Sequence, residues 1–175
     1  MYKRQLKEYS SEFNFIVDEI DAQEIEKIAI SSTKIRNSIN QGDLETTKKY
    51  LGRFFSLTGK VVKGDGLGKQ IDYPTANILI EEDYKIIPKD GVYYIRTRID
   101  NKLYNGMMNI GHRPTIGNKA KSIEVNLFNF DRDIYDKIIS IDVVVKIRDE
   151  KKFSSINALK AQLAKDQEHL SLIHI

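Results

Sequence analysis

KGDGLGKQIDYPTAN, residues 63–77, separates two short segments in which apolar residues alternate with polar ones. Its first half has a glycine at every second position, so the backbone can adopt positive φ and approach a ligand without an intervening Cβ. Successive backbone N–H groups in such a loop form a nest for anionic oxygens, and a lysine adds a positive charge. We therefore expect phosphate groups to be held by Gly64, Gly66, Gly68 and Lys69. For the glycines alone, an ordinary turn between strands is the alternative explanation.

The second half of the stretch is Pro74-Thr75-Ala76-Asn77. Thr75 and Asn77 are two residues apart, so on an extended segment their side chains point to the same face. A hydroxyl and an amide oxygen suit Mg²⁺, which prefers oxygen ligands and keeps several water or phosphate oxygens in its shell. A phosphate-binding loop beside a magnesium site predicts a nucleoside triphosphate. The loop is not a Walker A motif, since no G-K-[ST] ends it.

A tyrosine followed by Pro-Thr-Ala-Asn, behind a glycine loop at this spacing, resembles the signature of the riboflavin kinase family. In bacteria this activity is commonly the C-terminal module of a bifunctional riboflavin kinase/FAD synthetase. The resemblance implies transfer of the ATP γ-phosphate to the ribityl 5′-hydroxyl of riboflavin, with Mg²⁺, to give FMN. It also implies a six-stranded Greek-key barrel with a C-terminal helix.

The residue pattern on both sides of the glycine loop predicts a β-barrel without that resemblance. From Phe54 onward apolar residues recur at every second position, as in strands with one buried face. Asp100-Asn101 forms a tight turn between two of these segments. Six strands without intervening helices indicate a closed antiparallel sheet, although not its strand order. The expected strands are 57–61, 76–80, 91–99, 102–110, 122–130 and 138–147.

Residues 154–168 predict one amphipathic helix after the last strand, with Ile156, Leu159 and Leu163 on its inner face. The expected fold is therefore mainly β, an antiparallel barrel with a C-terminal helix. We assign residues 53–170 to this riboflavin kinase domain and expect residues 171–175 to be a non-native tail.

Residues 1–52 are expected to be a short α/β-derived remnant that contains a helical hairpin. Phe13-Asn14-Phe15-Ile16-Val17 and Ile28-Ala29-Ile30 indicate short strands or a strand and a turn. Ser31 and its neighbours are good N-caps for a helix that ends near Gly42. A second helix follows, with Asp43 as its cap and Gly52 at its end. We predict no secondary structure for about the first five residues.

The hexapeptide Ser31–Arg36 also resembles the S-S-[ST]-x-I-R motif of nucleotidyltransferases. In the bifunctional family this motif closes the FMN adenylyltransferase module, and the resemblance implies that it binds a triphosphate at a helix N-terminus. The matching residues are Ser31, Ser32, Thr33 and Arg36. The same activity needs an H-x-G-H type site, but the only histidines are His112, His169 and His174. We therefore expect no FAD synthetase activity from this chain and an adenylyltransferase module in its parent protein.

Glu124 lies in the strand sequence SIEVNLFNF, and a solvated surface carboxylate is the plain explanation for it. In riboflavin kinases this strand carries a glutamate read as the general base, and Glu124 falls on that position. Phosphoryl transfer needs mainly positioning and charge neutralisation, with a carboxylate to orient the hydroxyl. Family members often have a histidine two residues later, where this chain has Asn126.

Two further segments resemble loops that lie beside the ligands in this family. Asn109 opens N-[IV]-G-x-x-P-[TS], and Arg148 opens R-x-E-x-x-F. Without the resemblance, the first is a Gly/Pro turn and the second a solvated charge cluster before a helix. We expect Asn109 and Arg148 to contact the flavin or the nucleotide.

The composition excludes several classes of protein. The chain has 175 residues, of which 41% are hydrophobic and 30% charged, as in an ordinary globular protein. Its net charge of +3 is small and its basic residues are scattered, so the sequence does not predict nucleic-acid binding. It has no cysteine, and no apolar run reaches the roughly 18 residues of a membrane-spanning helix. The cytoplasm is the expected location.

Two other functions stay open from the sequence. One is a non-catalytic small β-barrel that binds flavin or an oligonucleotide. The other is a folded module that binds flavin with little turnover.

Overall fold

The computed structural model describes residues 2–18, 24–25, 28–64, 68, 73–112 and 121–172. The chain divides into two compact units, residues 1–30 and residues 31–175. The helical hairpin thus belongs to the same compact unit as the barrel. The boundary near residue 52, which concerns family modules, stays a prediction.

The first unit contains α1 (Tyr2–Glu12) and an antiparallel pair of short strands, β1 (Glu24–Ile25) and β2 (Ile28–Ala29). The prediction of a strand near residues 13–17 was wrong, and α1 was missed. The N–H of Phe13 donates to the Tyr9 carbonyl over 3.0 Å, and the rings of these residues lie 5.9 Å apart. This apolar cluster therefore closes the last turn of a helix, and Asn14 ends it with a φ of 52°.

The second unit begins with the expected hairpin of α2 (Ser32–Gln41) and α3 (Leu44–Leu51). Ser31 caps α2 by accepting the N–H of Lys34 over 3.3 Å, and Gly42 ends it with a φ of 77°. Asp43 caps α3 by accepting the N–H of Thr46 over 3.0 Å. All of these caps were predicted, because capping depends on short-range geometry.

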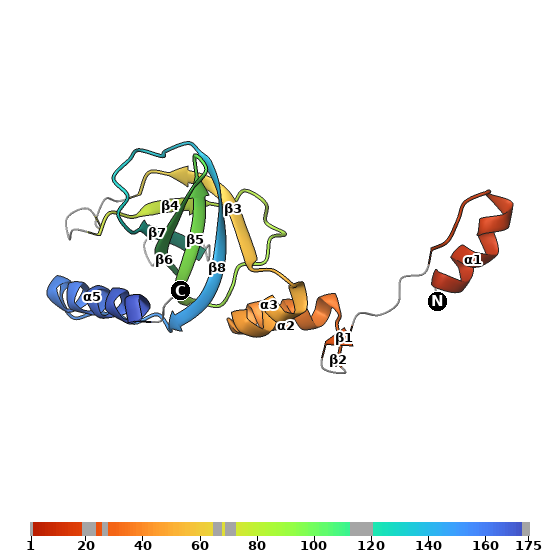
Figure 1. The fold of residues 1–175 in the computed structure, drawn as a ribbon, viewed down its shortest axis with the longest axis horizontal. Coiled ribbons are helices and arrows are strands. Elements are labelled where there is room, and N and C mark those ends of the chain that lie inside the picture. Colours follow the sequence, from red (N-terminus) through yellow and green to blue (C-terminus); the bar gives the residue numbers. More distant parts are fainter. Residues whose placement is uncertain are drawn as a thin grey trace. The chain divides into compact units, whose positions relative to one another are not determined.

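Six strands form the closed antiparallel barrel that the sequence predicts (Figure 1). Around the barrel the order is β3-β4-β7-β6-β5-β8. β5, β6 and β7 form a meander, and β8 returns to pair with β5, which is a Greek key. The strands are β3 (Phe55–Val62), β4 (Ala76–Leu79), β5 (Gly91–Ile99), β6 (Lys102–His112), β7 (Lys121–Leu127) and β8 (Ile138–Arg148).

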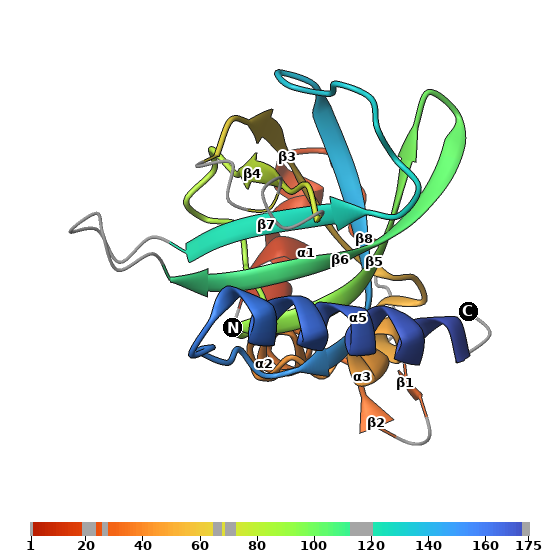
Figure 2. The ribbon, with the colours of Figure 1, turned by 90° about the vertical axis from the view of Figure 1, so that its left-hand side faces the viewer.

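The barrel buries side chains on two sides. Its interior holds one apolar cluster, which includes Val61, Ile78, Ile95, Met108, Ile110, Ile123, Val125 and Ile141. The outer face of β5 and β6 is covered by α5 (Ile156–Leu172), as Figure 2 shows. There Leu163 and Leu170 of α5 pack with Val92, Tyr94 and Met107. Burial on both faces explains why residues 91–95 of β5 are all buried.

The bounds of several elements differ from the prediction by a few residues. β4 stops at Leu79, β7 stops at Leu127, and α5 begins two residues later than expected. Ile156 is 54% exposed, so its place on the inner face of the helix was wrong. The buried side of α5 lies further along, where Asp166 and Leu170 are buried.

Candidate functional site

A row of directly paired residues crosses the outer face of the barrel from β4 to β8. Asn77 on β4 pairs with Glu124 on β7, which pairs in turn with Asn109 on β6. Val92 on β5 pairs with both Asn109 and Arg148, which extends the row to β8. Directly paired residues of antiparallel strands share one face, with Cβ atoms about 4.5–5.5 Å apart. Pairing therefore brings together four of the predicted site residues, which come from four separate segments.

This row faces outward because its neighbours along each strand fill the barrel. Ile78 beside Asn77, Ile123 and Val125 beside Glu124, and Ile110 beside Asn109 are all buried in the interior cluster. Side chains alternate between the two faces of a strand. Glu124 and Asn109 are half-buried rather than exposed, because other elements partly cover the row.

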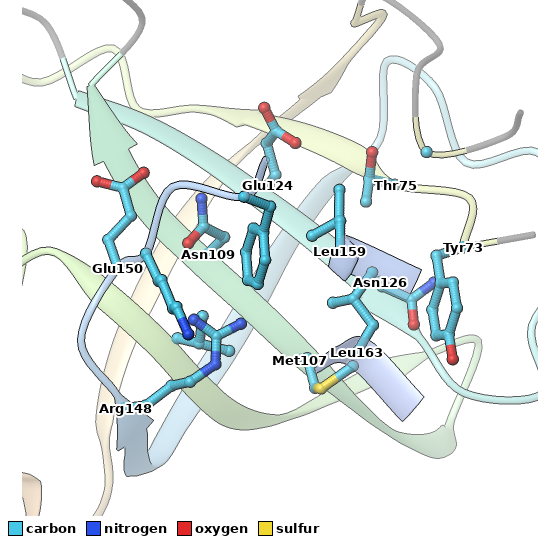
Figure 3. A pocket seen from close by; sticks show the side chains of 14 residues that line it. Tyr73, Thr75, Met107, Asn109, Glu124, Asn126, Arg148, Glu150, Leu159 and Leu163 are labelled. Atoms are coloured by element: carbon cyan, nitrogen blue, oxygen red, sulfur yellow. The ribbon is translucent and has the colours of Figure 1, made fainter. Parts of the chain in front are cut away.

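A cavity of about 220 Å³ lies between this outer face and the first turns of α5. Figure 3 shows Glu124 and Thr75 at one end of it and Arg148 at the other. Leu159 and Leu163 contribute the apolar wall from α5. The lining residues that were not among the predicted site residues are Tyr73, Val92, Met107, Asn126, Glu150, Lys151, Phe153, Leu159 and Leu163.

Gly64 and Gly68, the described glycines of the loop, pack directly against the predicted magnesium ligands. A Cβ on Gly64 would collide with the side-chain amide of Asn77, and one on Gly68 would lie 2.9 Å from the Thr75 hydroxyl. Among the described glycines, positive φ occurs at Gly42, Gly52 and Gly91. At Gly64 and Gly68 the close approach of the Asn77 and Thr75 side chains is the reason for glycine. Gly66 and Lys69 lie outside the described residues.

The donor set around Thr75 and Asn77 is suited to Mg²⁺ that also binds phosphate. No cluster of three His, Cys, Asp or Glu residues able to hold a metal occurs among the described residues. A hydroxyl and an amide oxygen are neutral ligands, so phosphate oxygens would supply most of the negative charge. The Thr75 and Asn77 side chains fit that role by their chemistry, and glycine at positions 64 and 68 lets the loop backbone approach both of them.

A second cavity of about 460 Å³ also includes Thr75 in its lining. Val61, Ala76 and Val125, all from the interior cluster or packed against it, form part of its wall. The remaining wall comes from the segment that links β7 and β8, residues 130–135. Thr75 therefore stands between two cavities, one of which contains Glu124.

Arg148 is held by a carboxylate on α5. Its Nε lies 2.9 Å and its NH2 2.8 Å from Oδ2 of Asp166, which is 4% exposed. Gln162 donates to the other oxygen of Asp166 over 2.8 Å. Asp166 was not among the predicted site residues, although the sequence carries a signal for it, since Asp166 continues the stripe formed by Leu159, Leu163 and Leu170. A charged residue on a buried helix face requires a partner.

The other predicted residues lie away from this cavity. Ser31, Ser32, Thr33 and Arg36 are exposed at the start of α2, and none of them lines the cavity. Ser31 uses its hydroxyl to cap the helix. His112 is the last residue of β6, where its Nδ1 lies 2.8 Å from Oδ2 of Asp90, and it does not line the cavity.

Together, the barrel and its cavity define a small-molecule site, with a carboxylate, amides and a hydroxyl at one end and an arginine at the other. The sequence model of the riboflavin kinase family matches residues 51–173. The chain therefore belongs to the riboflavin kinase family, and the predicted class of enzyme is confirmed at the level of the family.

Curated relatives support the same family. The chain is 37% identical over 164 residues to the bifunctional riboflavin kinase/FMN adenylyltransferase of Haemophilus influenzae, covering 93% of this chain and 53% of the relative. It is 39% identical over 142 residues to the protein of that description from Bacillus subtilis, covering 79% of this chain and 45% of the relative. The chain thus spans about half the length of these relatives.

A solved structure from Streptococcus pneumoniae, described as a macrolide-efflux protein, superposes with a TM-score of 0.82 at 36% identity. The match covers 95% of this chain and 53% of that one. It supports the fold, and we draw no activity from its description. Within the described part of this chain, no helix is both long enough and apolar enough to span a membrane.

Proposed function

We propose that this chain transfers the γ-phosphoryl group of ATP to the 5′-hydroxyl of riboflavin and so makes FMN. The observation that carries this proposal is the direct pairing of Asn77 with Glu124, which places a candidate magnesium ligand next to a candidate base. Both side chains lie on the outer face of the barrel, and Glu124 lines the cavity beneath α5. Family membership supplies the substrates.

In this proposal, Thr75 and Asn77 would hold Mg²⁺ together with phosphate oxygens, and the bound ion would supply positive charge to neutralise the transferring group. The loop residues Gly64, Gly66, Gly68 and Lys69 bind the phosphates through backbone N–H groups and one ammonium group. The 5′-hydroxyl oxygen of riboflavin attacks the γ-phosphorus, and Glu124 accepts the proton that this hydroxyl loses. The bond from that phosphorus to the β–γ bridging oxygen breaks, and ADP leaves.

The two cavities suggest where each substrate binds. An in-line transfer requires the nucleotide and the alcohol to approach the phosphoryl group from opposite sides. The cavity beneath α5 contains Glu124, so we assign riboflavin to it. The second cavity shares Thr75 but lacks Glu124, so we assign the nucleoside of ATP to it.

Asn109 and Arg148 belong to the riboflavin side of this arrangement. Asn109 pairs directly with Glu124, so its amide lies beside the ribityl end. Arg148 is three strands from Glu124 in the row, which is roughly 14 Å along the sheet at about 4.8 Å per strand. We therefore assign Arg148 to the ring end of riboflavin rather than to the phosphates.

For the whole protein we propose the organisation of the bifunctional relatives. Residues 53–170 form the riboflavin kinase domain, and residues 1–52 are the end of an FMN adenylyltransferase module, with 171–175 as a tail. The parent protein then carries the N-terminal adenylyltransferase module and acts in the cytoplasm on small molecules. Neither nucleic acid nor a membrane is a proposed partner.

The test is an assay of FMN formation from riboflavin, ATP and Mg²⁺ with this chain. We expect FMN to form only when all three are present, and no FAD to follow. Quenching of riboflavin fluorescence in the presence of Mg-ADP provides a second measurement that does not need turnover. Binding of a single-stranded oligonucleotide with a steep salt dependence, without FMN formation, would favour the non-catalytic barrel.

A further inference from the structure

We infer that Asp166 is a positioning residue for riboflavin binding, and that it acts by aligning the guanidinium group of Arg148 in the wall of the cavity. The inference rests on the proposed function, which assigns this cavity to riboflavin. Asp166 itself lies outside every motif named above.

The contacts of Asp166 are those of an orienting group. Both of its oxygens face Arg148, with Nε at 3.2 Å from Oδ1 and 2.9 Å from Oδ2, and NH2 at 2.8 Å from Oδ2. The two-atom contact sets the plane of the guanidinium group as well as its position. Gln162 fixes the carboxylate in turn by donating to Oδ1 over 2.8 Å. A relay of three side chains therefore ends at Arg148.

Arg148 keeps donors for a ligand after these contacts are made. An arginine has five N–H groups. Within the described part of the chain, Nε and NH2 engage Asp166, and NH1 donates to the Asp149 carbonyl over 3.2 Å. One N–H on each terminal nitrogen is left. Arg148 lines the cavity, and its guanidinium carbon lies 5.8 Å from the centre of the Phe153 ring, which lines it too. A flat ring with carbonyl acceptors, such as that of riboflavin, fits this corner.

The alternative is that the pair only docks α5 on the barrel. Both side chains are largely buried, with Arg148 20% and Asp166 4% exposed. Removing one partner of such a pair leaves an uncompensated buried charge, whereas replacing both with apolar residues is often neutral for stability. The two explanations therefore predict different behaviour for a double apolar variant.

The experiment compares wild type, Asp166→Asn, the double variant Arg148→Met with Asp166→Leu, and Asp142→Asn. Asp142, which like Arg148 lies on β8, is the matched control, because it accepts a 2.6 Å hydrogen bond from Ser56 on β3 and does not line the cavity. For each protein, KM for riboflavin, KM for ATP, kcat and the thermal unfolding midpoint are measured. Riboflavin affinity is also measured directly by fluorescence quenching.

We expect Asp166→Asn to raise KM and Kd for riboflavin about 10- to 100-fold, the effect of one lost charge-assisted hydrogen bond. KM for ATP should stay within about twofold, because Arg148 lies roughly three strand spacings from Glu124. The double variant should recover the thermal unfolding midpoint of the wild type, while its KM and Kd for riboflavin should stay raised. Asp142→Asn should behave as wild type in both KM values.

Three outcomes would overturn this inference. The first is an unchanged KM and Kd for riboflavin in Asp166→Asn. The second is an equal rise in KM for riboflavin and KM for ATP in that variant. The third is a double variant that recovers wild-type affinity for riboflavin. If Asp166→Asn does not fold, the double variant alone decides between positioning and docking. A wild-type chain that neither makes FMN nor binds riboflavin would refute the proposed function, and the positioning role with it.

Discussion

Asn77 of β4 and Glu124 of β7 are directly opposed across two antiparallel strands, on the face of the barrel that points away from its interior. Their Cβ atoms are therefore about 4.5–5.5 Å apart. This separation is short enough for one phosphoryl group and its metal to contact both side chains. Asn109 lies on the other side of Glu124 at the same level. The carboxylate thus stands between two amides, and together with Asn109 it lines the cavity beneath α5.

Glu124→Gln tests the carboxylate as the base. Glutamine keeps the size and most hydrogen bonds of the side chain but cannot accept the proton, so we expect kcat to fall at least about 100-fold. Riboflavin affinity, measured by fluorescence quenching, should change little. Glu81→Gln on the exposed segment after β4 is the control. Near-normal turnover in Glu124→Gln would remove this residue from the chemistry.

Thr75→Ala combined with Asn77→Ala tests the magnesium site. Both candidate oxygen ligands are lost, so we expect Mg-ATP binding to be abolished in isothermal titration. Riboflavin alone should still bind, because the wall formed by α5 is intact. An unchanged affinity for Mg-ATP would reject the metal assignment.

Gly64→Ala tests whether this glycine is needed for close packing. The new Cβ would collide with the Asn77 amide and displace it, so we expect KM for ATP to rise about tenfold or more. Gly52→Ala is the contrasting variant. Gly52 has a φ of 68° and open space around its Cβ position, so alanine there should cost about 1 kcal/mol of stability and leave KM unchanged. The same rise in KM for both variants would contradict the packing argument.

The ion pair of Lys60 and Asp136 predicts a pH dependence of stability. Nζ of Lys60 lies 2.8 Å from Oδ1 of Asp136. The hydrogen bond lowers the pKa of Asp136 below 3.8 and raises the pKa of Lys60 above 10.5. The carboxylate's contribution is therefore present above pH 3.8 and is lost as pH falls through its folded pKa. The lysine's contribution is present below pH 10.5 and is lost as pH rises through its folded pKa.

Asp136→Asn isolates this effect, because asparagine tolerates the positive φ of 62° at this position. Thermal unfolding should show a lower midpoint than wild type between about pH 5 and pH 9, and the difference should vanish in strong acid. The difference should also shrink with added salt, since both side chains are exposed. A difference that persists at pH 2 would show that the pair is not its cause.

The parts of the fold that depend on neighbours along the chain were predictable. The caps Ser31, Gly42, Asp43 and Gly52 follow from side-chain reach and left-handed backbone, and the strands follow from a period of two. The first helix was missed because an apolar cluster of three or four residues does not distinguish a strand from a helix end. The inner face of α5 was misplaced at Ile156, because the stripe alone does not say where contact with the barrel begins.

For the candidate site, the residue types could be chosen from motifs, but their arrangement could not. Asn77, Glu124, Asn109 and Arg148 were each singled out from separate segments. Their common row depends on the register of four strand pairings. A shift of one residue in any of them would turn a side chain to the other face.

The amino-acid sequence by itself determined the helices and strands of residues 31–175 to within a few residues, the mainly β class with a closed barrel, and the oxygen-bearing residues, because propensity, capping and periodicity act over a few residues. Only the tertiary structure decided that Glu124 lies between Asn77 and Asn109, that Thr75 separates two cavities, and that Asp166 holds Arg148. These relationships join distant segments, and they arise from barrel closure and from the docking of α5. Both are consequences of burying apolar surface over the whole unit.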